Sequence, residues 1–208
     1  MSFRHLLAST ALCAGLLVSA HAQAASLTGS FATWAAAVTG YQTISNTGVA
    51  LYNPITSIVA ADGAVLTLSD AGDTVAQPFD GWGPWSGGYT GDVVVKTLKT
   101  EVFTFATGLS ALGMDLSPDL PFFGPFSETF TVTLSDGTTA SFPNTFAQGD
   151  TQFVGFLNGH NITSMTITST VNADFAFGNI VEAPEPVSAS LLVAGIAGLG
   201  LVRRRARG

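Results

Sequence analysis

Hydrophobic and polar residues alternate along much of the chain between residues 93 and 180. Alternation with a period of two predicts β-strands that bury one face. Residues 128–134 are the clearest case, because Phe130, Val132 and Leu134 share one face and threonines occupy the other. The stretch Ser135-Asp136-Gly137-Thr138 follows and predicts a tight turn, with the chain returning over residues 139–142. This segment is the strongest hairpin signal in the chain.

The same pattern predicts short strands throughout the body, spaced at roughly 8 to 12 residues with almost no helical periodicity. We expect strands at 41–43, 49–52, 64–68, 93–98, 101–106, 110–116, 128–134, 139–142, 151–157, 162–169 and 174–180. Residues 30–38 fit either a short helix or the approach to a strand. This pattern predicts an all-β fold, an antiparallel sandwich of two sheets.

The two ends of the chain read differently from the body. Arg4 and His5 precede an apolar run at residues 6–18, and small residues follow it up to residue 25. These features predict a secretory signal peptide over residues 1–24. The only cysteine, Cys13, lies inside this leader, so the mature protein has no disulfide and no thiol ligand or nucleophile.

The C-terminal segment, residues 183–208, contains Pro184-Glu185-Pro186, an uncharged and mostly apolar stretch at 187–202, and a terminal arginine cluster that includes Arg203, Arg204 and Arg205. Sixteen helical residues rise about 24 Å, which is enough for a short transmembrane helix flanked by snorkelling arginines. Arginines remain on the cytoplasmic side, so we expect the ectodomain, residues 25–182, to lie outside the cytoplasm.

These three features in this order resemble the PEP-CTERM sorting signal of Gram-negative bacteria. The resemblance implies an exosortase-type enzyme as processing partner. It also implies an inner-membrane anchor with the body in the periplasm, followed by release to the cell surface or extracellular matrix. An ordinary C-terminal membrane anchor is the alternative.

Charge narrows the range of partners. Residues 25–184 hold two lysines and thirteen acidic residues, a net charge of −11. Such a body repels nucleic acid and anionic membranes. Charged residues are nevertheless sparse, at 10% of the chain, and hydroxyl residues are common.

Residues 77–92, QPFDGWGPWSGGYTGD, combine five glycines, two prolines and four aromatics. This density excludes regular structure and predicts a long loop, and long loops often carry function. Trp82, Trp85 and Tyr89 are candidate glycan contacts, because the C–H face of a sugar stacks on aromatic rings. The alternative is that the tryptophans fold back as a lid over one end of the core.

Several short motifs within residues 77–181 resemble a recurring ectodomain of PEP-CTERM proteins. They are Gly81-Trp82, the stretch from Trp85 to Asp92, Leu112-Gly113-Met114, Ser135-Asp136-Gly137, Phe153-Val154-Gly155-Phe156 and the stretch from Asp174 to Asn179. The resemblance implies a jelly-roll-like sandwich similar to carbohydrate-binding modules, and it brings no catalytic residues.

The sequence gives little support for a catalytic site. His160 lies in a predicted turn, and the sequence does not show which carboxylates meet as a glycosidase pair would require. Aspartates in or near turns are weak candidates for a structural calcium site, with turn formation as the alternative: Asp70, Asp73, Asp80 and Asp92. No other cofactor is expected.

We therefore expect a non-enzymatic, exopolysaccharide-associated binding module of the cell surface or biofilm matrix. One alternative is a structural or adhesive subunit that pairs with other proteins through a sheet edge. A glycan-cleaving enzyme is the other.

Overall fold

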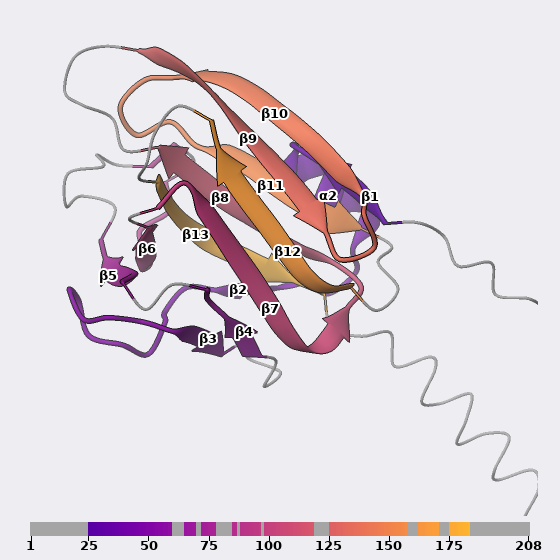
Figure 1. Cartoon of the computed structure of the whole chain (residues 1–208), viewed down its shortest axis with the longest axis horizontal. Coiled ribbons are helices and arrows are strands. Elements are labelled where there is room, and N and C mark those ends of the chain that lie inside the picture. Colours follow the sequence, from indigo (N-terminus) through magenta and orange to yellow (C-terminus); the bar gives the residue numbers. More distant parts are fainter. Residues whose placement is uncertain are drawn as a thin grey trace, which may run out of the picture.

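The computed structural model describes residues 25–59, 65–69, 72–77, 85–86, 88–96, 98–118, 125–157, 162–170 and 175–183. These residues form two antiparallel β-sheets packed face to face, with one short helix beside them (Figure 1). The prediction of an all-β, two-sheet body is confirmed. The expected signal peptide at 1–24 and the expected sorting signal from residue 184 onward lie outside the described residues.

The seven-stranded sheet has β13 (Phe175–Glu182) near its centre. Along the sheet the order is β1 (Ser26–Thr28), β11 (Gln152–Leu157), β8 (Leu112–Pro118), β13, β6 (Val93–Lys96) and β5 (Thr74–Ala76). The short strand β2 (Gln42–Ile44) pairs with the C-terminal part of β13. The register of β13 on β8 shifts between Gly178 and Val181, where Asn179 has a φ of 46° and donates a 2.8 Å hydrogen bond to Asp115.

The six-stranded sheet follows the order β10 (Thr139–Phe146), β9 (Phe126–Leu134), β12 (Ile162–Ser169), β7 (Thr100–Leu109), β4 (Val65–Thr67) and β3 (Ser57–Val59). Its first two strands are the predicted hairpin, which is confirmed. In its turn Gly137 has a φ of 88°, and the Thr138 amide donates to the Asp136 carboxylate at 2.8 Å. This bond lowers the pKa of Asp136.

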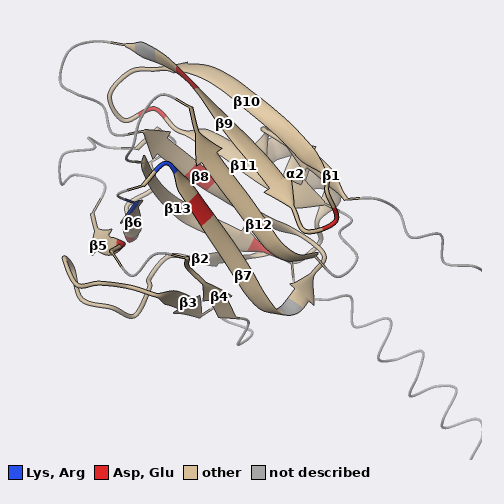
Figure 2. Cartoon of the chain, viewed as in Figure 1, with Lys and Arg blue, Asp and Glu red and all other residues tan. Residues whose placement is uncertain are grey.

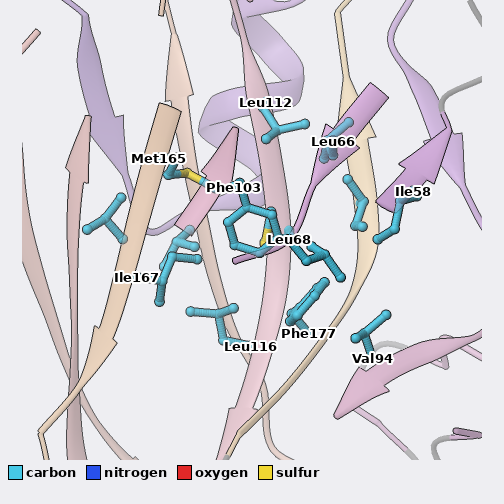
Figure 3. Close-up of a cluster of buried hydrophobic side chains, with 14 of the residues drawn as sticks. Ile58, Leu66, Leu68, Val94, Phe103, Leu112, Leu116, Met165, Ile167 and Phe177 are labelled. Atoms are coloured by element: carbon cyan, nitrogen blue, oxygen red, sulfur yellow. The ribbon is translucent and has the colours of Figure 1, made fainter. Parts of the chain in front are cut away.

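The core lies between the two sheets, where alternate side chains of each sheet meet. Figure 3 shows Phe103 and Phe177 at its centre, and their ring centroids are 4.9 Å apart. Aliphatic residues from both sheets surround the two rings: Ile58, Leu66, Leu68, Val94, Leu112, Leu116, Met165 and Ile167. Burial of apolar area at about 25 cal/mol per Å² is the main force that holds the sheets together.

The described helix is α2 (Phe31–Ala37), which decides between the two interpretations of residues 30–38. Ser30 caps it by accepting a hydrogen bond from the Thr33 amide at 3.2 Å. The helix packs its fully buried Trp34 against β11, and the indole Nε1 donates to the main-chain oxygen of Phe156 at 3.0 Å. Among the described residues, no helix is long and apolar enough to cross a membrane.

Some strand predictions were wrong. Residues 49–52 form a turn that leads into Pro54, and Tyr52 has a φ of 64°. The three-residue strands β1, β3 and β5 were missed, because three residues are too few to show alternation. Strand β10 continues past its predicted end through Pro143, which an edge strand tolerates because the missing N–H faces outward.

Candidate binding surface and buried charge cluster

The aromatic loop does not present Trp85 to solvent. Trp85 is 2% exposed and packs with Ala76, Val93 and Ala176 on the side of the seven-stranded sheet away from the main core. The centroids of the Trp85 and Tyr89 rings are 5.9 Å apart. For Trp85 this arrangement agrees with the folded-back alternative rather than with an exposed sugar platform. Trp82 lies outside the described residues.

Tyr89 is held in the same cluster. Its hydroxyl donates to the main-chain oxygen of Asp92 at 2.8 Å, and burial raises its pKa to about 12. Added Cβ atoms on Gly91 and Gly178 would lie 2.5 Å and 3.1 Å from the Tyr89 side chain, so these glycines make room for the ring. Tyr89 is thus a packing residue that keeps some exposed surface.

The calcium candidates are not gathered into a site. Asp92 uses its carboxylate to hold a neighbouring loop, accepting from the Thr47 amide at 2.9 Å and from Gln77 at 3.3 Å. Asp73 lies buried beside Lys96. Asp70 and Asp80 fall outside the described residues. Within the described part of the chain, no three His, Cys, Asp or Glu residues are grouped as metal ligands.

The outer face of the six-stranded sheet is rich in hydroxyl groups and poor in charge. Because Phe130, Val132 and Leu134 point into the core, the intervening threonines of β9 point outward. Figure 2 shows few charged residues on β9, β10 and β12, and Glu128 is the only one among them by sequence. We call this surface the hydroxyl face; its members are Ser127, Thr129, Thr131, Thr133, Thr139, Ser141, Thr145, Ser164, Thr166 and Thr168.

Hydroxyl groups on adjacent strands form cross-strand pairs. Ser127 and Thr145 are hydrogen-bonded at 2.9 Å, near one end of the β9–β10 hairpin. Thr133 and Thr139 are hydrogen-bonded at 3.1 Å, near the turn at its other end. Strands in a sheet lie about 4.8 Å apart, so the hydroxyl face is a regular grid of short polar groups.

An open hollow of about 460 Å³ lies at the end of the hydroxyl face that is remote from the hairpin turn. This volume is in the range of small-ligand sites. The side chains that line it are neutral apart from one carboxylate; they are Ser127, Glu128, Thr129, Pro143, Asn144, Thr145 and Thr170. Glu128 is almost fully buried and accepts a short hydrogen bond from the Ser169 hydroxyl.

A cluster of three charged side chains lies between the sheets. Lys96 Nζ is 2.9 Å from Glu101 Oε2 and 3.4 Å from Asp73 Oδ1, and all three side chains are fully buried. Lys96 is the last residue of β6, and Asp73 is the residue before β5, the strand that pairs with β6. Glu101 comes from β7 in the opposite sheet. We call these three residues the charge triad.

The charge triad contains one cation and two carboxyl groups. The pKa of Asp73 is raised to about 7, mainly by burial and also by the adjacent Glu101, while Lys96 partly opposes the increase. Asp73 therefore keeps its proton at pH values where an ordinary aspartate is ionised. The sequence predicts Asp73 only as a weak calcium candidate and assigns no site to Lys96 or Glu101.

No known family model matches the chain, and no curated protein matches it by sequence. Among solved structures, an exo-β-agarase is similar to it over 58% of this chain and 24% of its own, with 10% identity and a TM-score of 0.37. The N-terminal modules of a Clostridium thermocellum endo-1,4-β-D-xylanase complexed with xylohexaose match 66% of this chain and 29% of their own, with 12% identity and a TM-score of 0.33.

A xylan-binding domain from Paenibacillus barcinonensis matches over 64% of this chain and 97% of its own, with 10% identity and a TM-score of 0.31. The chain spans less than a third of the agarase and of the xylanase modules. These likenesses are too distant to bear on the fold or the ligand.

Proposed function

We propose that this protein is an exported, non-enzymatic module that binds an uncharged stretch of exopolysaccharide in the hollow on its hydroxyl face. The observation that carries the proposal is the lining of the hollow by hydroxyl and amide groups that both donate and accept hydrogen bonds. Sugar hydroxyls have the same dual character. The net charge of −11 over residues 25–184 disfavours an anionic polymer and leaves a neutral one as the better partner.

The hollow suits binding better than cleavage. Glycoside hydrolysis uses two carboxyl groups on opposite sides of the scissile bond. Among the described residues that line the hollow, Glu128 is the only one with a carboxyl group. We therefore assign recognition, rather than hydrolysis, to this surface.

Pairing through a sheet edge, as in a structural or adhesive subunit, is the weaker candidate. The outermost strands β1, β3 and β5 have three residues each. The longer edge strand β10 carries Pro143, which has no N–H to offer an incoming strand. Short and proline-bearing edges are typical of proteins that avoid edge-to-edge association.

The binding test uses paired hydroxyls at the two ends of one hairpin. The double variant Ser127→Ala, Thr145→Val removes the pair at the hollow, and Thr133→Val, Thr139→Val removes the pair near the turn. Because both partners of each bond are replaced together, stability should change little. Calorimetric titration with the producing cells' own exopolysaccharide should show about tenfold weaker binding for the first variant only, as loss of one or two hydrogen bonds implies.

Equal affinity in both double variants would remove the hollow as the binding site. Trp82→Ala tests the loop separately, because Trp82 was one of the three candidate contacts. Loss of binding in Trp82→Ala alone would move the site to residues 77–92. Concentration-dependent association in sedimentation without polysaccharide would favour the adhesive subunit.

Sorting is a separate part of the proposal and rests on the sequence of the two ends. We assign residues 1–24 as the signal peptide and residues 183–208 as a PEP-CTERM sorting signal that holds a jelly-roll-like body at the inner membrane until an exosortase-type enzyme processes it. Pro184→Ala, Glu185→Ala, Pro186→Ala should leave the chain unprocessed in the membrane fraction. Release of this variant at the wild-type rate, measured by fractionation and immunoblotting, would contradict the assignment.

A further inference from the structure

We propose that Lys96 and Asp73 condense to form an intramolecular isopeptide bond, with Glu101 as the group that moves the protons. The bond joins Lys96 Nζ to the side-chain carbonyl carbon of Asp73. It converts the buried charge triad into a covalent link between β6 and the residue that leads into β5. The inference does not depend on polysaccharide binding, because it concerns the interior of the sandwich.

The geometry brings the reacting groups together without water. Register pairs Thr74 with Val95, so Asp73 and Lys96 are the next residues to face each other across two antiparallel strands. Lys96 Nζ lies 3.4 Å from Asp73 Oδ1, so the amine is in contact with the carboxyl group that it would attack. Because both side chains have no exposed surface, solvent does not compete as a nucleophile or reverse the reaction.

The hydrogen bonds give the two carboxyl groups different roles. Glu101 Oε1 accepts from the Ser69 amide at 2.6 Å and from the Ser69 hydroxyl at 3.1 Å, and its Oε2 lies 2.9 Å from Lys96 Nζ. Asp73 has no such anchoring hydrogen bonds from main-chain or hydroxyl donors in the described part of the chain, and its carboxyl group lies against Lys96 and Glu101 alone. Glu101 is therefore fixed as the acid–base group, and Asp73 is the carboxyl group available for attack.

The protons and charges balance. Glu101 takes a proton from the Lys96 ammonium, and the free amine attacks the carboxyl carbon of protonated Asp73. The nitrogen of the resulting tetrahedral adduct loses its second proton by way of Glu101, the C–OH bond breaks, and the hydroxyl leaves as water. The products are a secondary amide, one water molecule and a protonated Glu101, with no net charge. General acid–base catalysis and lysine nucleophiles both work in this way.

Burial favours the reaction at each stage. The raised pKa of Asp73 supplies the protonated carboxyl group that the step requires. Two carboxyl groups and an ammonium are costly to hold in an apolar core, and unmatched buried oxygens add to that cost. An amide and a neutral carboxyl group remove the charges and can hydrogen-bond to each other.

Peptide mapping tests for the bond directly. The full chain is isolated from the cells that make it, unfolded in denaturant and digested with chymotrypsin. Cleavage after Leu68, Phe79, Tyr89 and Leu98 gives peptides 69–79 and 90–98. We expect one branched peptide whose mass is the sum of the two less one water. Its fragment ions should place the branch at Lys96 and at Asp73, not at Asp70 in the same peptide.

Variants separate the roles of the three residues. Asp73→Ala and Lys96→Met should each give only linear peptides. Glu101→Gln preserves shape and should also give only linear peptides, because an amide does not accept the lysine proton. The exposed Lys99 is the matched control, and Lys99→Gln should retain the branch. Far-UV circular dichroism establishes that each variant has folded.

Only linear peptides from the folded wild-type protein would overturn the proposal. A branched peptide in wild type that persists unchanged in Glu101→Gln would overturn the role of Glu101. The wild-type measurement needs no substitution, so a variant that fails to fold does not affect the test of the bond.

Discussion

Opening the isopeptide ring should destabilise the fold by an amount that follows from its size. The ring closed by Asp73 and Lys96 contains 24 residues along the chain, counting both ends. A cross-link that closes a loop of this length lowers the entropy of the unfolded chain and stabilises the native state by about 3.4 kcal/mol at 25 °C in the loop-entropy treatment. Glu101→Gln, which leaves the ring open, should lose this stabilisation.

Urea denaturation followed by far-UV circular dichroism measures the loss of unfolding free energy. In thermal unfolding of a domain of this size, the same loss corresponds to a decrease in Tm of about 7 to 14 °C. The dependence of unfolding free energy on urea should also become steeper in Glu101→Gln, because an open chain exposes more surface on unfolding. Loss of the contact between Glu101 and Lys96 alone changes stability but not this slope.

Lys99→Gln provides the control, since Lys99 is exposed and outside the charge triad. Its midpoint and slope should match those of the wild type. Equal urea slopes in wild type and Glu101→Gln, with a stability difference below about 1 kcal/mol, would contradict a covalent link between Asp73 and Lys96.

Three other predictions concern charge and packing. In Glu101→Gln, burial still raises the pKa of the uncondensed Asp73, so the unfolded chain loses that proton first and unfolding free energy should fall as pH rises above about 4; urea titrations of this variant over a pH series check the fall, and a pH-independent unfolding free energy would contradict it. Gly113→Ala places a Cβ 2.3 Å from the ring of Phe153 and should cost about 1–3 kcal/mol in urea denaturation. Trp34→Phe removes the indole hydrogen bond to β11 and should lower unfolding free energy by about 1–3 kcal/mol, whereas an unchanged midpoint would show that this bond contributes nothing.

The alternation of residues predicted much of the six-stranded sheet. It placed Phe130, Val132 and Leu134 inside and the threonines of the same strand outside, as the structure has them. It did not predict which strands lie side by side, because lateral order depends on contacts between residues far apart in sequence. The grid of hydroxyls across β10, β9 and β12 therefore became visible only in the fold.

The charge triad also depends on contacts between residues far apart in sequence, which alternation does not predict. Lys96 shares its face with Val94, and Glu101 shares its face with Phe103 and Phe105, so strand parity alone places both charges inward. That signal was present in the sequence. The sequence pattern does not show that β5 pairs with β6 or that β7 packs opposite them. This arrangement brings Asp73 beside Lys96 and Glu101.

For Trp85, the sequence predicts the irregular backbone correctly but not the position of the side chain. A glycine-rich aromatic stretch correctly predicts irregular structure, since glycine and proline disfavour strands and helices. It does not reveal where an indole lies, because the same ring can stack on a ligand or fill a space beside a sheet. Here small residues of the sheet, including Ala76 and Ala176, leave that space for Trp85.

The central place of β13 determines how the molecule responds to mechanical load. Any attachment to the chain beyond Ala183 pulls on β13, which is bonded to β8 on one side and to β6 and β2 on the other (Figure 1). Force that enters through an edge strand can peel its hydrogen bonds apart one after another. Force along β13 must shear three strand pairings at once, so the body should resist tension applied from its C-terminal side.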